Sequence, residues 1–90
     1  MRTPIIAGNW KMHKTIPEAR QLVQDLKAGV SGASGVEIIV APVFTALSAV
    51  ADQLSGSPIK LAAQNVFWEE QGAFTGEIGP EMLKDAGCSH

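Results

Sequence analysis

Three short runs of apolar residues divide the chain, at residues 5–7, 36–41 and 59–63. Their apolar character is too continuous for strands with one solvated face, in which apolar and polar positions alternate. Continuous runs are typical of parallel strands that are buried on both faces. The pattern therefore predicts three parallel β-strands, each covered on both sides.

Between the first two runs, the apolar positions recur at three- and four-residue steps, as in an amphipathic helix. Thr15 and Glu18 have the spacing of a capping box, and Pro17 is tolerated in the first helical turn. Gly29 and Gly32 are stop signals at the far end. The stripe that we expect to face the sheet consists of Ala19, Leu22, Val23, Leu26 and Val30.

Two further helices are predicted. One spans about residues 45–54 and is closed by the turn at residues 55–58, and a shorter one opens at Gly79-Pro80 and ends at Gly87. Residues 88–90 then resemble the opening of another strand. Alternating strands and helices indicate right-handed βαβ units and a parallel sheet. Both a doubly wound sheet and a closed barrel share this pattern, and periodicity does not separate them.

One connection, residues 65–79, is much longer than the usual two to six residues between a strand and a helix. It carries Phe67, Trp68 and Phe74, three of the five aromatic residues of the chain. Either these rings pack against a partner, or they fold back onto their own sheet.

Composition narrows the function classes. Ninety residues with 46% hydrophobic residues form a single packed domain, and the net charge of −2 with scattered basic residues argues against nucleic-acid or membrane-surface binding. The single cysteine, Cys88, excludes an internal disulfide, and with His13 and His90 it makes no zinc site. We therefore expect a reducing, cytoplasmic compartment. No apolar run reaches the length of a signal-peptide core or a membrane span.

The first strand is followed by residues whose side chains could bind a ligand or take part in catalysis. Ligand sites of parallel sheets lie at the carboxyl ends of the strands, which is where Asn9 and Lys11 stand. Asn9 has an amide donor, and Lys11 has a compact positive charge suited to a phosphate or an oxyanion. The alternative is that Asn9 begins a turn and Lys11 is merely solvated.

Each of the remaining candidate residues has a functional and a purely structural interpretation. His13 is an acid, a base or a ligand, or else a solvated loop residue. Cys88 is a nucleophile or a small core residue. Glu69 and Glu70 bind cations or are simply exposed.

Four local strings together resemble the triosephosphate isomerase family. They are Ala-Gly-Asn-Trp-Lys-Met at residues 7–12, Ala-Pro with Phe-Thr at residues 41–45, Ala-Gln-Asn at residues 63–65 and Gly-Ala-Phe-Thr-Gly-Glu at residues 72–77. The resemblance covers the whole chain. It implies an α/β fold, the (β/α)₈ barrel, of which residues 1–90 form the N-terminal portion of a single domain, about three and a half of the eight units.

The resemblance also implies an activity and a set of site residues. The family interconverts dihydroxyacetone phosphate and glyceraldehyde 3-phosphate through an enediolate, without a cofactor or metal, as a cytoplasmic homodimer of glycolysis and gluconeogenesis. Asn9 and Lys11 match its substrate-binding pair, Lys11 being also catalytic. Thr75 matches the residue that reaches toward the neighbouring subunit's site, and the positions that match interface or loop-anchoring residues are Gln64, Asn65 and Glu77.

The family's electrophilic histidine and general-base glutamate have no counterpart among these residues, and His90 precedes the position of that histidine. We therefore expect the 90 residues alone to be inactive. The alternative hypothesis is a non-catalytic half-barrel fragment or scaffold, whose open sheet edges invite self-association. A doubly wound binding domain is disfavoured because the chain has no glycine-rich phosphate loop.

Overall fold

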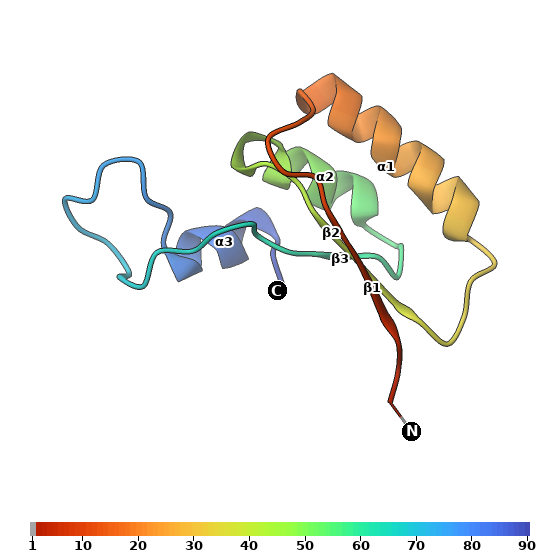
Figure 1. Cartoon of the computed structure of the whole chain (residues 1–90). Helices are drawn as coiled ribbons and strands as arrows, with labels where there is room; N and C mark the ends of the chain where they lie inside the picture. Colours follow the sequence, from red (N-terminus) through yellow and green to blue (C-terminus); the bar gives the residue numbers. More distant parts are fainter. Residues whose placement is uncertain (1) are drawn as a thin grey trace.

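A computed structural model describes residues 2–90 and contains a three-stranded sheet with three α-helices (Figure 1). A single 3₁₀ turn, Phe44–Ala46, leads into the second helix. In chain order the elements are β1 (Ile5–Asn9), α1 (Ile16–Val30), β2 (Glu37–Ala41), α2 (Leu47–Leu54), β3 (Lys60–Leu61) and α3 (Pro80–Ala86).

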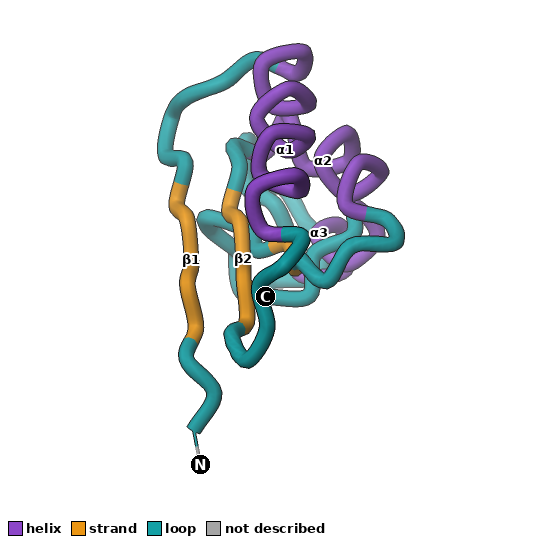
Figure 2. Tube along the Cα trace, turned by 90° about the vertical axis from the view of Figure 1, so that its right-hand side faces the viewer, coloured by secondary structure: helices purple, strands orange, loops and turns teal. Residues whose placement is uncertain are grey.

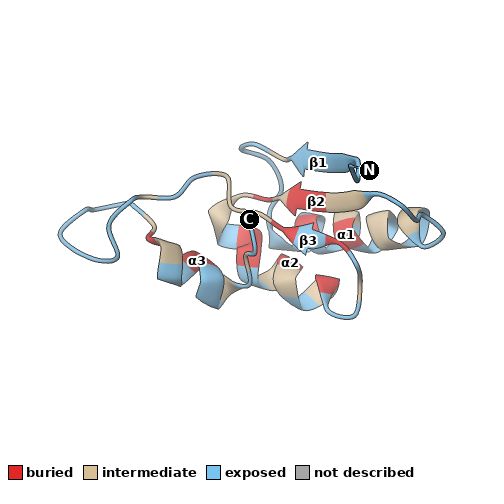
Figure 3. Ribbon diagram, turned by 90° about the horizontal axis from the view of Figure 1, so that it is seen from below, coloured by how far each residue is buried: buried red, intermediate tan, exposed pale blue. Residues whose placement is uncertain are grey.

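The sheet is parallel, and its strand order β1-β2-β3 follows the sequence. The register runs from Ile5 beside Glu37 to Asn9 beside Ala41. Helices α1 and α2 lie on the same side of the strands, as the views in Figures 2 and 3 agree. A doubly wound sheet reverses its strand order and places helices on both faces, whereas a barrel does neither. The arrangement of these strands and helices therefore favours the barrel.

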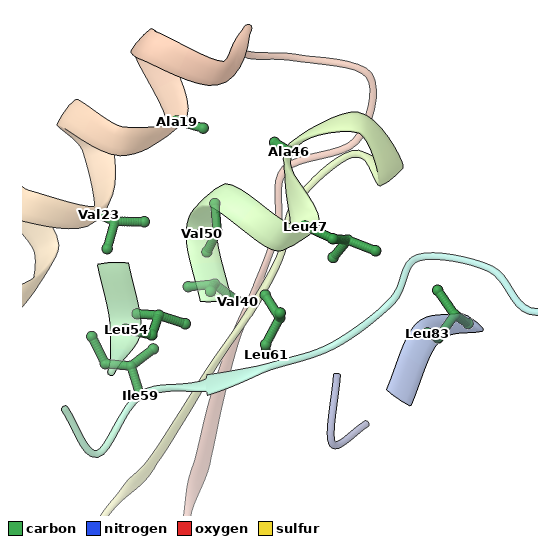
Figure 4. Packing of buried hydrophobic residues seen from close by; sticks show 10 residues of the cluster. All are labelled: Ala19, Val23, Val40, Ala46, Leu47, Val50, Leu54, Ile59, Leu61 and Leu83. Carbon is green, nitrogen blue, oxygen red and sulfur yellow. The ribbon is translucent and has the colours of Figure 1, made fainter. Parts of the chain in front are cut away.

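The hydrophobic core fills the space between the helices and one face of the sheet (Figure 4). Val40 and Leu61 supply the sheet side of this core, and Val23 and Val50 supply part of the helix side. No buried polar side chain interrupts it within residues 2–90. The buried residues of the cluster are Ala19, Val23, Val40, Ala46, Leu47, Val50, Leu54, Ile59, Leu61 and Leu83.

The expectation that every strand is buried on both faces is wrong for β1. All five of its residues are exposed, with Ile5 at 57% and Ile6 at 60% (Figure 3). The reason is geometric, because β1 is an edge strand and the face of the sheet opposite the helices is uncovered. The radius of gyration, 13.7 Å, also exceeds the roughly 12 Å of a compact domain of this length.

The open face carries charge at the amino ends of the strands. The Glu37 carboxylate lies 3.1 Å from the Lys60 ammonium and 3.5 Å from Nε2 of His90. Residues 88–90 are not a strand, contrary to expectation, yet they lie along β3. The backbone N–H groups of Ser89 and His90 donate to the Leu61 carbonyl, and Ala63 donates to the His90 carbonyl.

Helix ends agree with the sequence signals at most positions. Helix α3 begins after Gly79, and Gly87 closes it in a left-handed conformation with φ of 110°. The prediction of Gly29 as a stop signal is wrong, because α1 continues through Gly29 and ends at Val30, with Ser31 as its C-cap. A glycine inside a helix costs stability without breaking it.

The start of α1 predicts a pH dependence. The pKa of Glu18 lies below its ordinary value because its carboxylate accepts two hydrogen bonds from Thr15. The larger effect comes from the Thr15 backbone N–H and the smaller from the Thr15 hydroxyl, and both bonds are 2.9 Å long. A carboxyl group with a lowered folded-state pKa stabilises the fold above its unfolded pKa, and this contribution is lost as the pH falls through the folded pKa. We expect Thr15→Val to move the Glu18 midpoint upward in a carboxyl NMR titration. Ser31→Ala, at the opposite end of the helix, is expected to leave it unchanged.

The long loop of residues 65–79 projects beyond α3 and away from β1 (Figure 1). The Phe67 and Phe74 rings pack on each other with centroids 4.7 Å apart, and the Phe67 N–H donates to the Ile78 carbonyl. Trp68 remains 82% exposed. The aromatic residues therefore close the loop on itself rather than folding back onto the sheet.

Candidate active site

The candidate site lies at the carboxyl ends of β1 and β2. Asn9 is the last residue of β1 and stands beside Ala41, the last residue of β2. The N–H of Trp10 donates to the Ala41 carbonyl at 3.1 Å, which prolongs the strand pairing by one residue. The chain then leaves the sheet through an exposed loop that leads to α1 and carries Lys11.

Lys11 has an unusual backbone conformation, with φ of 57° in the left-handed region. Its N–H donates to Oδ1 of Asn9 at 2.9 Å, a local bond that turns the chain sharply after the strand. This bond uses the oxygen of the Asn9 amide and not its Nδ2 donor group. Asn9 therefore begins a turn and also presents a donor, so the two interpretations of this residue are compatible.

Gln64 is hydrogen-bonded to the same loop. It follows β3, and its Nε2 group donates to the carbonyls of Lys11 and Ala41, both at 2.9 Å. One side chain thus connects the ends of all three strands. The family resemblance pointed to Gln64 as an interface or loop-anchoring residue, and the geometry adds a definite target for the anchor.

The arrangement suits a small anion. Lys11 is an exposed lysine, and Asn9 lies two residues before it at the same sheet edge. An ammonium and an amide donor stabilise a phosphate group or an oxygen that gains negative charge during a reaction. Within residues 2–90, no cluster of His, Cys, Asp or Glu residues is placed to hold a metal ion.

Neither His13 nor His90 is hydrogen-bonded to Asn9 or Lys11 in the part of the chain that the structure describes. His13 is exposed in the loop after Lys11. The His90 ring lies 3.5 Å from Glu37, at the end of β2 opposite to Ala41. The His90 ring therefore faces Glu37, while the His90 backbone pairs with Leu61 and Ala63 at the end of β3.

Cys88 lines a cavity of about 460 Å³ between the residues after β3 and α3. The lining is mainly apolar and includes Gln64, but neither Asn9 nor Lys11. Burial raises the pKa of the Cys88 thiol, which keeps it protonated and a poor nucleophile. These surroundings favour the reading of Cys88 as a packing residue.

The loop of residues 65–79 carries the remaining candidate residues. Asn65, Thr75 and Glu77 are exposed on it, and Figure 1 shows the loop extending away from the end of β1. The Glu77 N–H donates to the Phe74 carbonyl at 3.0 Å, which shapes the turn around Thr75. Glu69 and Glu70 are also exposed, and their backbone carbonyls approach Gly79 so closely that a Cβ there would lie 2.9 and 2.8 Å away.

Comparison with known proteins connects these features to one family. The family described as triosephosphate isomerase matches residues 4–90. The triosephosphate isomerases of Pelobacter propionicus and Geotalea uraniireducens are 67% and 62% identical over all 90 residues, which correspond to 36% of each relative's length. The crystal structure of triosephosphate isomerase from Bartonella henselae superimposes with a TM-score of 0.91 at 39% identity, covering 99% of this chain and 36% of that one.

None of the helices in residues 2–90 has the length and apolar character needed to cross a membrane. The chain spans about a third of the length of the curated relatives that it matches.

Proposed function

Because this chain belongs to the triosephosphate isomerase family, we propose that it supplies the substrate-binding end of β1 to an enzyme that interconverts dihydroxyacetone phosphate and glyceraldehyde 3-phosphate. The observation that carries this proposal is the placement of Asn9 and Lys11 at the carboxyl edge of a parallel sheet, where barrel enzymes hold their substrates. The remaining two thirds of the barrel supply the other catalytic groups.

Lys11 has two tasks in this mechanism. Its ammonium attracts the phosphate dianion of the substrate, and it stabilises the negative oxygen that develops as the enediolate forms. The Nδ2 group of Asn9 donates a hydrogen bond at the same edge. Proton transfer between the two carbon atoms requires a general base and an electrophile, which the family places beyond residue 90. We therefore propose that residues 1–90 alone do not catalyse the isomerisation.

We further propose that the enzyme is a cytoplasmic homodimer that uses no cofactor. Thr75, at the exposed turn of the long loop, reaches the site of the second subunit, and the other interface or loop-anchoring residues are Gln64, Asn65 and Glu77. This role is supported by the way the loop closes on itself through Phe67 and Phe74. A loop that is held by its own contacts presents its outer turn to a partner without a large ordering cost.

A hybrid enzyme tests the proposal. Residues 1–90 of this chain replace the matching segment of the Pelobacter propionicus relative, and the unmodified relative is the control. We expect kcat/KM of the hybrid to lie within about tenfold of the control, and the purified 90-residue chain to show no turnover. A hybrid that folds and dimerises but is inactive contradicts the proposed function and favours the scaffold hypothesis.

Size-exclusion chromatography of the 90-residue chain distinguishes an independently folded module from a segment of a larger barrel. An independently folded module is expected to elute as a clean 9.5 kDa monomer. A segment whose open sheet face belongs inside a barrel is expected to associate, because β1 exposes both apolar side chains and an unpaired edge.

A further inference from the structure

Resting on the proposed function, we infer that Gln64 is a positioning residue that holds Lys11 in its working orientation without touching the substrate. Two hydrogen bonds carry this inference. Both start from Nε2 of Gln64, one ending at the Lys11 carbonyl and the other at the Ala41 carbonyl, and each is 2.9 Å long. A primary amide nitrogen has two hydrogens, so these two bonds use its full donor capacity.

The backbone of Lys11 needs such support. Its φ of 57° lies in the left-handed region, which a lysine adopts at an energetic cost and keeps only when its surroundings impose it. The Lys11 N–H is bound by Oδ1 of Asn9, and the Lys11 carbonyl is bound by Gln64. Both polar groups of the residue are therefore held, which fixes the direction in which its side chain leaves the backbone.

The second hydrogen bond of Gln64 attaches its side chain to the end of β2. The Ala41 carbonyl belongs to the last residue of β2, and it also accepts the N–H of Trp10 at 3.1 Å. The Lys11 loop is thereby attached to the rigid sheet at two places. One attachment is the bond between Trp10 and Ala41, and the other is Gln64. Only Gln64 is bonded to Lys11 itself.

The consequence is a specific functional loss. Without the Gln64 donors, the Lys11 ammonium remains present but is distributed over several directions. Misplacing a catalytic group by about 1 Å costs as much as 10²-fold in rate. For Gln64→Met, which removes both donors and keeps the side-chain length, we expect kcat/KM of the hybrid enzyme to fall about tenfold.

A double-mutant cycle separates positioning from a general structural role. The cycle compares Gln64→Met, Lys11→Met and the double variant, with Gln24→Met on the exposed face of α1 as the matched control. If Gln64 acts through Lys11, its substitution has little further effect on kcat/KM once Lys11 is absent. Additive losses in the double variant overturn the inference, and so does a Gln64→Met enzyme with unchanged kinetics.

Backbone hydrogen exchange tests the same inference without catalysis. We expect the amides of residues 11–14 in the folded hybrid to exchange at least about tenfold faster in Gln64→Met than in the parent or in Gln24→Met. Unchanged exchange overturns the inference even if the hybrid is active. Faster exchange in an inactive hybrid supports the role of Gln64 on the loop and contradicts the proposed function instead.

Discussion

Replacing Lys11 with methionine is expected to lower kcat/KM of the hybrid enzyme by about 10²- to 10³-fold. The substitution removes the positive charge at the carboxyl end of β1 and keeps most of the apolar stem. Loss of one preorganised group that stabilises a developing oxyanion typically costs about 2.7–4 kcal/mol of transition-state stabilisation. Steady-state kinetics in both reaction directions measures the change, and we expect both an increase in KM and a decrease in kcat.

Lys14→Met is the matched control for this prediction. Lys14 is exposed in the same loop and also has a positive φ, of 79°, so the two substitutions change the net charge and the loop backbone similarly. We expect Lys14→Met to change kcat/KM by no more than a few fold. Equal losses in the two variants mean that the loop acts through its total charge, and the individual role of Lys11 is then refuted.

Gly87→Ala is expected to destabilise the fold by about 2–4 kcal/mol. Gly87 closes α3 with φ of 110°, a conformation in which an alanine is strained. A Cβ at this position would also lie 2.6 Å from Cβ of Ala51 on α2, and overpacking of this kind costs about 1–3 kcal/mol. The midpoint of urea unfolding of the hybrid enzyme, with a constant slope, measures the loss.

Gly56→Ala separates the two causes. Gly56 also has a positive φ, of 80°, but no atom lies within 4 Å of the position that its Cβ would take. This variant therefore carries backbone strain without a collision, and we expect a loss of about 1 kcal/mol. If the two variants lose the same stability, the close approach of α3 to α2 at Gly87 contributes nothing.

The sequence predicts the helices well where local signals agree with packing. The capping box at Thr15 and Glu18 and the Gly79-Pro80 start of α3 are confirmed, because these signals depend only on nearby residues. The strands are harder to predict, since their burial depends on residues distant in sequence. Ile5 and Ile6 have the pattern of a covered strand, and nothing local indicates that this strand forms an open edge.

The site shows the same division. The order of the strands suffices to place Asn9 and Lys11 at the carboxyl edge of the sheet. The position of Gln64 under the Lys11 loop comes from a contact between residues 53 positions apart, and periodicity carries no such information. A polar residue directly after a buried strand, in a chain whose strands lie side by side, is the signal that points to such a contact.

The open edge of β1 has a consequence for synthesis on the ribosome. In a closed barrel, the first strand pairs with the last, so its outer hydrogen-bonding groups wait until the whole chain has been made. The helix-covered core forms from residues close in sequence and is available early, whereas closure of the barrel is a slow, long-range event. During that interval, the unpaired edge of β1 and the exposed side chains of Ile5 and Ile6 favour mispairing with other nascent chains.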